Sequence, residues 1–334
     1  MATVAILAAS GYSGQETLDR VLRHPELEVV ALGSDSLEGE SASALDVRLN
    51  GSLPPFVANE QALAAGADLV FACLGNDRAA LLEPPAGAVV VDLSGAHRLQ
   101  DALLYPAWYG FEHPLPGALA DWSYAVPELY PPQGALIANP GCYATAAILA
   151  LEPLRGAIDE SSVVIDAKSG VSGAGHNVDD AYLFGTIDES VRPYGVPKHR
   201  HTPEIAQEVR GMSGRATRLT FTPHLIPMNR GLIATCYATL RGGVDAARVA
   251  DAYATAYAEE PFVRVTTSYP ATKATLGSNW CLVHAVVDEA NHRLVAFAAI
   301  DNLVKGAAGS AIQNLNAMRG YPETMGLEAL PLWP

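Results

Sequence analysis

The sequence predicts an α/β protein in two parts, a doubly wound parallel sheet followed by an α+β part with a mostly antiparallel sheet. Two observations support this fold class. Up to about residue 142, short, continuously apolar segments alternate with amphipathic ones, as in parallel sheets buried on both faces. Beyond it, the apolar segments are longer, alternate with polar residues and return in hairpin fashion. A chain of 334 residues is long enough for both parts.

In the first part, apolar runs and turn residues define the expected elements. A helix is expected over residues 13–25, because Leu18, Val21 and Leu22 share one face and Pro25 follows. Buried strands are expected at residues 3–9, 27–34, 67–75, 87–95 and 134–141.

In the second part, alternation replaces continuous apolar runs. Strands are expected at residues 161–170, 218–227, 231–243, 262–270 and 281–301, the last folding back at a turn near residues 288–292. Helices are expected over residues 245–260 and 303–320. The helix over residues 303–320 is rich in small residues, which allow close packing, and we expect it to pack against the first part of the chain.

Composition and charge exclude several classes of protein. The net charge of -15 argues against a nucleic-acid surface, which needs a basic footprint. No apolar run reaches the length of about 18–20 residues that a membrane span requires. The first residues lack a basic region before the apolar stretch, so we interpret them as a strand and not as a signal peptide. A cytoplasmic protein is expected.

A glycine-rich turn follows the first strand. It comprises Ser10, Gly11, Tyr12, Ser13 and Gly14 and opens the first helix. In dinucleotide-binding (Rossmann-type) domains, such a turn brings backbone N–H groups and a helix N-terminus against a pyrophosphate. Ala8 replaces the usual first glycine, and an ordinary strand–helix turn is the alternative.

The end of the second strand leaves the choice of dinucleotide open. Asp35 is an acid where NAD sites hold the ribose 2′-hydroxyl. Ser34 and Ser36, on either side of it, can donate hydrogen bonds to the 2′-phosphate of NADP.

Cys142 differs from the other three cysteines. Cys73, Cys236 and Cys281 lie in strand-like runs and are expected to be reduced core thiols. Cys142 follows the turn formers Asn139, Pro140 and Gly141 and opens an apolar helix, where free N–H groups and the helix dipole stabilise a thiolate. A buried structural cysteine at a helix start is the alternative.

Two further segments carry candidate site residues. In "GVPKHRHTPEI", His199 and His201 precede a helix start and are candidates for an acid–base partner of the thiol. No zinc-type spacing is present, so no metal site is predicted, and surface histidines are the alternative. In "KSGVSGAGHN", a glycine-rich loop after a strand is suited to holding an anionic group.

These residues together resemble the N-acetyl-gamma-glutamyl-phosphate reductases of the long type, in the semialdehyde dehydrogenase superfamily. The resemblance spans nearly the whole chain. It includes the segments "SGYSGQE", "DLSGAHRL", "WYGFEHP", "AVPELY", "ANPGCYATA", "SGVSGAG", "YGVPKHRHTPEI", "FTPHLIPMNRG", "GSNWCLVHA" and "DNLVKGAAGSAIQNLN".

The resemblance implies NADPH-dependent reductive dephosphorylation of N-acetyl-gamma-glutamyl phosphate in arginine biosynthesis. It implies that Cys142 forms a thioester and that the acid–base is His201 in preference to His199. The implied domains are a dinucleotide-binding domain over residues 1–142, a catalytic and dimerisation domain over 143–305, and a C-terminal helix over 306–334 that returns to the first domain. A homodimer or homotetramer is expected.

The resemblance also implies two sets of ligand contacts. The residues expected to bind the cofactor NADP are Ser10, Gly11, Tyr12, Ser13, Gly14, Ser34, Ser36, Ser169, Gly170 and Asn302. The residues expected to bind the substrate, or the inorganic phosphate that leaves it, are Arg98, Asn139, Ser172, Gly173, His176, Glu204 and Arg230. Ala8 and His176 depart from the family pattern, which usually has Gly and often Arg at these positions.

Three other functions remain open on the sequence. A related reductase could act on aspartyl phosphate or on a carrier-bound aminoadipyl phosphate. A non-catalytic dinucleotide sensor would bind the cofactor without turnover that depends on Cys142. A cysteine hydrolase is disfavoured, because hydrolysis needs no dinucleotide-binding loop.

Overall fold

The computed structural model describes residues 1–49, 53–176, 179–213 and 218–332. The last residue of the predicted "KSGVSGAGHN" loop, at position 177, lies outside these ranges. The chain divides into two compact units, Met1–Pro140 with Ala307–Glu328, and Gly141–Gly306 with Ala329–Pro334. The first break therefore lies between Pro140 and Gly141, within the turn that precedes Cys142.

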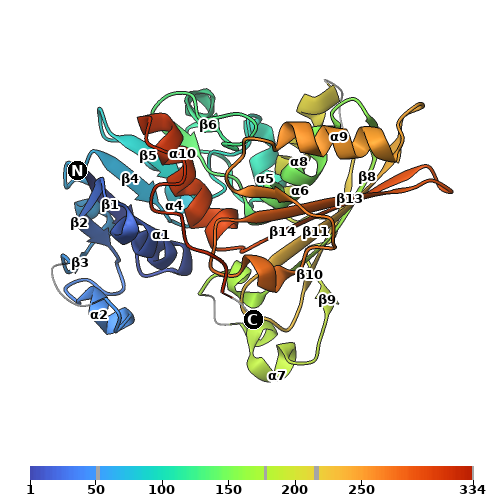
Figure 1. The fold of residues 1–334 in the computed structure, drawn as a ribbon. Helices are drawn as coiled ribbons and strands as arrows, with labels where there is room; N and C mark the ends of the chain where they lie inside the picture. The colour runs from blue at the N-terminus through green and yellow to red at the C-terminus, as the bar shows by residue number, and fades with distance from the viewer. Residues whose placement is uncertain (50–52, 177–178, 214–217, 333–334) are drawn as a thin grey trace. The chain divides into compact units, whose positions relative to one another are not determined.

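The first unit is built on a seven-stranded parallel sheet (Figure 1). Its strand order is β3-β2-β1-β4-β5-β7-β6. The strands are β1 (Ala2–Leu7), β2 (Leu27–Gly33), β3 (Phe56–Val57), β4 (Leu69–Ala72), β5 (Val89–Asp92), β6 (Ser123–Tyr124) and β7 (Leu136–Ala138). The order reverses at β1, so β1 lies between β2 and β4, and this is where doubly wound sheets bind nucleotides.

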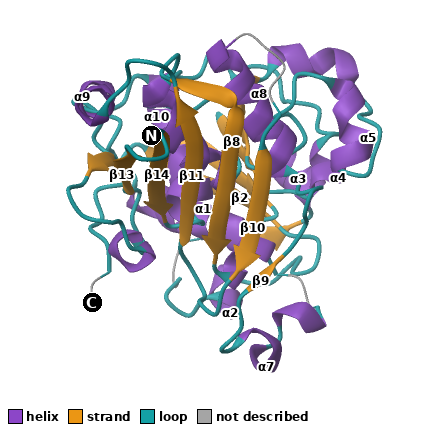
Figure 2. Cartoon of the chain, turned by 90° about the vertical axis from the view of Figure 1, so that its right-hand side faces the viewer, coloured by secondary structure: helices purple, strands orange, loops and turns teal. Residues whose placement is uncertain are grey.

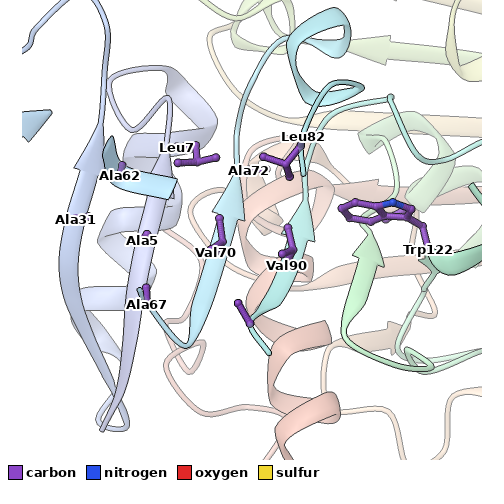
Figure 3. Close-up of a cluster of buried hydrophobic side chains, with 12 residues drawn as sticks. Ala5, Leu7, Ala31, Ala62, Ala67, Val70, Ala72, Leu82, Val90 and Trp122 are labelled. Carbon is purple, nitrogen blue, oxygen red and sulfur yellow. The ribbon is translucent and has the colours of Figure 1, made fainter. Parts of the chain in front are cut away.

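Most helices of the first unit lie among its strands in the sequence, and one comes from the C-terminal part of the chain. They are α1 (Tyr12–Arg23), α2 (Ala42–Leu45), α3 (Asn59–Leu63), α4 (Asn76–Ala79), α5 (Tyr105–Trp108) and α10 (Gly309–Arg319). Helix α10 contacts α1, and Asn316 at its end hydrogen-bonds His24 at 2.9 Å. Strands β4 and β5 are buried at every position, and their residues are apolar except for Asp92 at the end of β5. Figure 3 shows part of the core, with Leu7, Val70 and Val90 from the strands beside Leu82 and Trp122.

The second unit is built on a mixed sheet in the order β12-β13-β14-β11-β8-β10-β9. The strands are β8 (Ile158–Ser169), β9 (Arg192–Pro193), β10 (Thr220–Leu225), β11 (Leu232–Leu240), β12 (Val263–Val265), β13 (Cys281–Asp288) and β14 (Arg293–Ile300). Four of its six strand pairs are antiparallel, while β8 pairs with β10 and β12 pairs with β13 in parallel. The predicted fold class is confirmed.

The second unit also contains four α-helices among its described residues, α6 (Cys142–Leu151), α7 (Phe184–Ile187), α8 (His201–Ser213) and α9 (Ala246–Ala256). Of these, α6, α8 and α9 pack against strands of the sheet. Helix α6 contacts β11 and β14, and α8 contacts both α6 and β8. Figure 2 shows β11, β8 and β10 side by side. Along β11, Ala234, Cys236 and Ala238 are buried, whereas Ile233 and Tyr237 on the other face stay partly exposed.

All four cysteines are thiols outside any disulfide. Cys236 and Cys281 are fully buried in strands, as expected. Cys73 differs, because it follows the end of β4 and is only half-buried, 3.8 Å from the Thr17 hydroxyl. Among the described residues, no helix is long and apolar enough to cross a membrane.

Candidate active site

The turn between β1 and α1 has the form that a dinucleotide phosphate requires. Gly11 is the N-cap of α1, and no side chain caps the helix. A Cβ on Gly14 would lie 2.4 Å from the Ala8 carbonyl oxygen and 2.6 Å from the Ala9 Cα, so only glycine lets the helix approach the strand end this closely. The uncapped N–H groups and the helix dipole together favour an anion.

Ala8 itself takes a conformation that favours glycine. Its φ is 51°, in the left-handed region that an alanine side chain disfavours. Two hydrogen bonds hold it there: the Ala8 N–H donates to the Asn59 Oδ1 at 2.6 Å, and the Ala9 N–H donates to the Gly33 carbonyl at 2.7 Å. The departure from the family pattern therefore preserves the shape of the turn at a cost in backbone strain.

The three predicted serines form a chain of hydroxyl groups beside this turn. The Ser34 hydroxyl is buried and lies 2.8 Å from the Ser10 hydroxyl and 3.4 Å from that of Ser36. Asp35, between Ser34 and Ser36, accepts the Asn59 N–H at 2.9 Å and the Arg78 guanidinium at 2.5 Å. These bonds lower the pKa of Asp35 to about 2, so it is a carboxylate at neutral pH.

Cys142 is the first residue of α6, whose N-cap Gly141 also lacks a side-chain cap. The rest of the helix is buried all round, which suits a core helix better than an amphipathic one. Gly306 packs directly on the cysteine, because a Cβ there would lie 2.6 Å from the Cys142 Cβ. The thiol is thus half-buried and tightly placed at the positive end of the helix.

Helix α8 begins beside the start of α6. Glu204, in the first turn of α8, is fully buried and its Oε1 accepts the Gly141 N–H at 2.7 Å. His201 is the first residue of α8 and is 5% exposed. Its ring centroid lies 5.9 Å from that of Tyr143, the residue after Cys142. The structure therefore brings Cys142, His201 and Glu204 into one region.

His199 has a different role in the geometry. Its Nδ1 accepts the His201 N–H at 3.1 Å and so caps the start of α8. Burial, with a smaller contribution from Arg200, lowers the pKa of His199 to about 3. His199 is therefore neutral at physiological pH and cannot supply an imidazolium there.

Two tyrosines complete this region, and the sequence analysis missed both. The Tyr194 hydroxyl donates to the Tyr143 hydroxyl at 3.0 Å, and the His199 ring packs edge-on against both tyrosine rings. Burial raises the pKa of Tyr194, with a smaller contribution from charge at Cys142. Tyr143 follows the cysteine directly, which is the one sequence signal that could have found it.

The predicted loop after β8 is held by hydrogen bonds within the second unit. The Ser172 hydroxyl donates to the Asn229 carbonyl at 2.7 Å and receives the Asn302 Nδ2 at 3.0 Å. The Asn302 Oδ1 accepts the Gly231 N–H at 2.7 Å, so both ends of this amide are bonded. Asn302 and Ser172 thus shape the loop.

The remaining members of the loop differ in exposure. Ser169 is buried and donates to the Gly170 carbonyl at 3.1 Å, whereas Gly173 and His176 are exposed. A Cβ on Gly170 would lie 2.5 Å from the Asn229 carbonyl oxygen. Close packing of the backbone therefore requires glycine at position 170.

Arg230 lies in the second unit next to a buried acid. Its side chain is 24% exposed, and its guanidinium lies 3.3 Å from the Asp301 carboxylate. Asp301 also accepts the N–H groups of Gly277, Leu303 and Val304. These donors hold the acid in place and so help to position Arg230.

Arg98 and Asn139 belong to the first unit and are buried in a polar network. Arg98 donates through Nε to the Asn139 carbonyl and through a terminal nitrogen to the Leu93 carbonyl, both at 2.8 Å. The Asn139 side chain bonds Ser310 and Asn314 of α10 at 3.1 Å each. These hydrogen bonds hold the chain at Asn139 within the first unit.

Two domain families match the chain. The semialdehyde dehydrogenase NAD binding domain matches residues 3–136, and the semialdehyde dehydrogenase dimerisation domain matches residues 142–302. An N-acetyl-gamma-glutamyl-phosphate reductase of Dehalococcoides mccartyi is 44% identical over 98% of both chains. One of Moorella thermoacetica is 41% identical over the full length of both.

The chain belongs to the N-acetyl-gamma-glutamyl-phosphate reductase family. The resemblance inferred from the sequence segments is thereby confirmed. Among solved structures, aspartate semialdehyde dehydrogenase II of Vibrio cholerae has a TM-score of 0.74 at 18% identity, covering 96% of this chain and 98% of the other. An aspartate semialdehyde dehydrogenase of Candida albicans with NADP has a TM-score of 0.66 at 16% identity, covering 96% of this chain and 99% of the other. At these identities the likeness is one of fold.

Proposed function

We propose that this protein reduces N-acetyl-gamma-glutamyl phosphate to N-acetylglutamate 5-semialdehyde and inorganic phosphate, in arginine biosynthesis. The observation that carries the proposal is Cys142 at the start of a buried helix, where its neighbour Tyr143 packs against His201, in a chain that matches reductases of this name over its full length. The cytoplasm is the proposed compartment.

Cys142 is the nucleophile in the first step. Its thiolate attacks the acyl carbon, a C–S bond forms, the C–O bond to phosphate breaks, and inorganic phosphate leaves. The helix start favours the thiolate over the thiol. Since Glu204 already binds the Gly141 N–H, stabilisation of the oxyanion falls to later N–H groups of the first turn of α6.

His201 serves the second step. A bound nicotinamide cofactor supplies the hydride that reduces the thioester. His201 then gives a proton to the resulting alkoxide and takes it back as the hemithioacetal collapses. Collapse breaks the C–S bond, releases the semialdehyde and returns the thiolate. His199, with its pKa lowered to about 3, stays neutral and holds the start of α8.

Residues of the β1–α1 turn fit a dinucleotide. The NAD(P)-binding character of this domain follows from the family match, and the Gly14 contact and the uncapped start of α1 are consistent with it. Ser10, Gly11, Tyr12, Ser13 and Gly14 are proposed to hold the pyrophosphate through main-chain N–H groups. The finer proposal is that NADP is preferred to NAD, which the Ser34 and Ser36 hydroxyl groups support.

Substrate contacts are proposed in the second unit. The exposed part of the 169–176 loop and the partly exposed Arg230 are suited to the anionic groups of the substrate or to phosphate. Glu204 is proposed to act on the site indirectly, because its side chain binds the Gly141 N–H next to Cys142. Arg98 and Asn139 are proposed to act within the first unit, where their hydrogen bonds hold the chain at Asn139.

The dimerisation-domain match indicates a homo-oligomer. A homodimer or homotetramer is proposed, and the partly exposed residues on the second face of β11 support an interface there. Sedimentation equilibrium would distinguish the two.

One assay tests the function. N-acetylglutamate semialdehyde and phosphate should drive reduction of NADP, and aspartate semialdehyde should be used at least about tenfold less well, because a site that binds a substrate's polar groups discriminates strongly. Preference for aspartate semialdehyde would instead assign a related reductase. Cofactor binding without turnover on either substrate would indicate a dinucleotide sensor.

A further inference from the structure

We propose that Arg78 selects NADP over NAD by binding the 2′-phosphate. Asp35 then acts by holding Arg78 and not by accepting a hydrogen bond from the ribose 2′-hydroxyl. This inference rests on the proposed function only in assuming that a dinucleotide binds at the β1–α1 turn. It resolves the conflict between Asp35, which is typical of NAD sites, and the serines around it.

The first step is the position of the pair. Asp35 follows β2 by two residues, and Arg78 lies in α4, which follows β4. The sheet order places β1 between these two strands. An ion pair that joins Asp35 to Arg78 therefore bridges the carboxyl end of β1, where the proposed dinucleotide turn begins.

The second step is the state of the Asp35 carboxylate. In NAD sites, the acid after the second strand accepts the ribose 2′-hydroxyl and repels a 2′-phosphate. Here the Asp35 Oδ1 accepts the Asn59 N–H at 2.9 Å, and its Oδ2 accepts the Arg78 guanidinium at 2.5 Å. The negative charge that would exclude a 2′-phosphate is thus compensated by Arg78.

The third step is the availability of Arg78. Its side chain is 53% exposed and that of Asp35 is 44% exposed, so the pair lies at the surface and a ligand can reach it. A guanidinium carries five donors, and one hydrogen bond to Asp35 leaves others to bind a phosphate. The Ser36 hydroxyl, also exposed, can donate to the same group. A phosphate placed where the ribose 2′-hydroxyl is normally read would meet this guanidinium.

The experiment is calorimetric binding of NADP and NAD to the full chain, without substrate. Arg78→Ala should weaken NADP binding by about 10- to 100-fold, the range for losing a charge-assisted hydrogen bond, and should change NAD binding by less than about threefold. Adenosine 2′,5′-bisphosphate and 5′-AMP, as minimal probes, should show the same contrast. Arg78→Lys should retain part of the NADP affinity, because it keeps a point charge.

A matched control is available on α1. Arg23 pairs with Asp19 at 3.0 Å and is 54% exposed, so it resembles Arg78 in pairing and exposure. Arg23→Ala should leave both affinities within about threefold, since the pair it removes is an ordinary surface ion pair. Asp35→Asn keeps an oxygen acceptor for Arg78 and should not weaken NADP binding.

Two results would overturn the inference. One is an equal change in NADP and NAD affinity with Arg78→Ala. The other is a loss of NAD affinity of about tenfold or more with Asp35→Asn, which would show that Asp35 reads the ribose. Because no turnover is needed, these results are independent of the proposed function. A protein inactive on the semialdehyde could still show the Arg78 effect, and an active one could lack it.

Discussion

Helices α1 and α6 begin with the same local structure, and the proposed function gives them different roles. Each follows a parallel strand, each has a glycine N-cap in extended conformation, and neither has a side-chain cap. The start of α1 carries the partly exposed Tyr12 on an amphipathic helix, whereas α6 is buried over its whole length after Cys142.

The difference lies in what packs around each first turn. At α1, Gly14 packs against the strand end at Ala8 and Ala9. At α6, Glu204 binds the Gly141 N–H and Gly306 packs on Cys142. The start of a helix favours negative charge in general, and under the proposed function that charge belongs to a ligand at α1 and to the Cys142 thiolate at α6.

The largest expected effect is at the start of α6. Cys142→Ser should lower kcat by roughly four powers of ten or more, as expected for removal of a nucleophile, and should leave NADP binding intact. Cys73→Ser is the matched control, because burial raises the pKa of Cys73 to about 12 and keeps it a thiol. Steady-state kinetics and calorimetry measure both. An active Cys142→Ser variant would refute the thioester mechanism.

The next effect separates the two histidines. His201→Asn should slow turnover by roughly two to four powers of ten and should slow alkylation of Cys142 by iodoacetamide near neutral pH. His199→Asn should do less. Full activity in the His201 variant with loss in the His199 variant would exchange the two roles.

The pH dependence of stability offers a second readout for His199. Folding lowers its pKa from 6.5 to about 3, so between these pH values the unfolded chain binds a proton that the folded chain does not. Stability should therefore fall as the pH falls through this window, and His199→Asn should reduce that loss. Urea unfolding at several pH values measures it, and an unchanged slope would contradict the assignment.

Two glycine substitutions sharpen the comparison directly. Gly14→Ala places a Cβ 2.4 Å from the Ala8 carbonyl oxygen and should weaken NADP binding by about tenfold or more, since α1 must shift. Gly306→Ala places one 2.6 Å from the Cys142 Cβ and should slow turnover and alkylation of Cys142 by a similar factor. Each variant serves as the control for the other. If each variant weakened NADP binding and slowed turnover to the same extent, the two helix starts would not be independent.

A smaller effect is expected for substitutions of Glu204, whose carboxylate accepts the N–H of the α6 N-cap residue Gly141. The N-cap region of α1 has no side-chain cap. Glu204→Ala leaves the buried Gly141 N–H without its acceptor and should lower the free energy of unfolding by about 1–3 kcal/mol. Glu204→Gln keeps an acceptor oxygen and should cost less. Urea unfolding of both variants tests this, and equal stabilities would mean that the hydrogen bond contributes little.

The smallest effect is expected at Ala8. Ala8→Gly should relieve the strain of a φ of 51° and raise the free energy of unfolding by at most about 1 kcal/mol, because the greater entropy of glycine in the unfolded chain offsets part of the gain. A loss of stability on thermal unfolding would show that the turn holds alanine without strain.

Elements defined by local pattern were predictable. The sequence alone places buried strands at β1, β4 and β5, a helix start after Gly11 and another at Cys142, because apolar periodicity and turn residues act over a few positions. Helix α8 begins at His201, close to the start that Thr202, Pro203 and Glu204 indicate. The candidate nucleophile and both candidate histidines could therefore be found without the tertiary structure.

Contacts between distant segments were decided by the tertiary structure. Glu204 reaches Gly141 across 63 positions, Gly306 packs on Cys142, and Arg78 pairs with Asp35 across 43 positions. Such pairs depend on strand order and crossover connections, which residue periodicity does not encode. Local pattern likewise does not predict that β10 lies parallel to β8 within a mostly antiparallel sheet. It also does not predict the positive φ of Ala8, which depends on the strands around it.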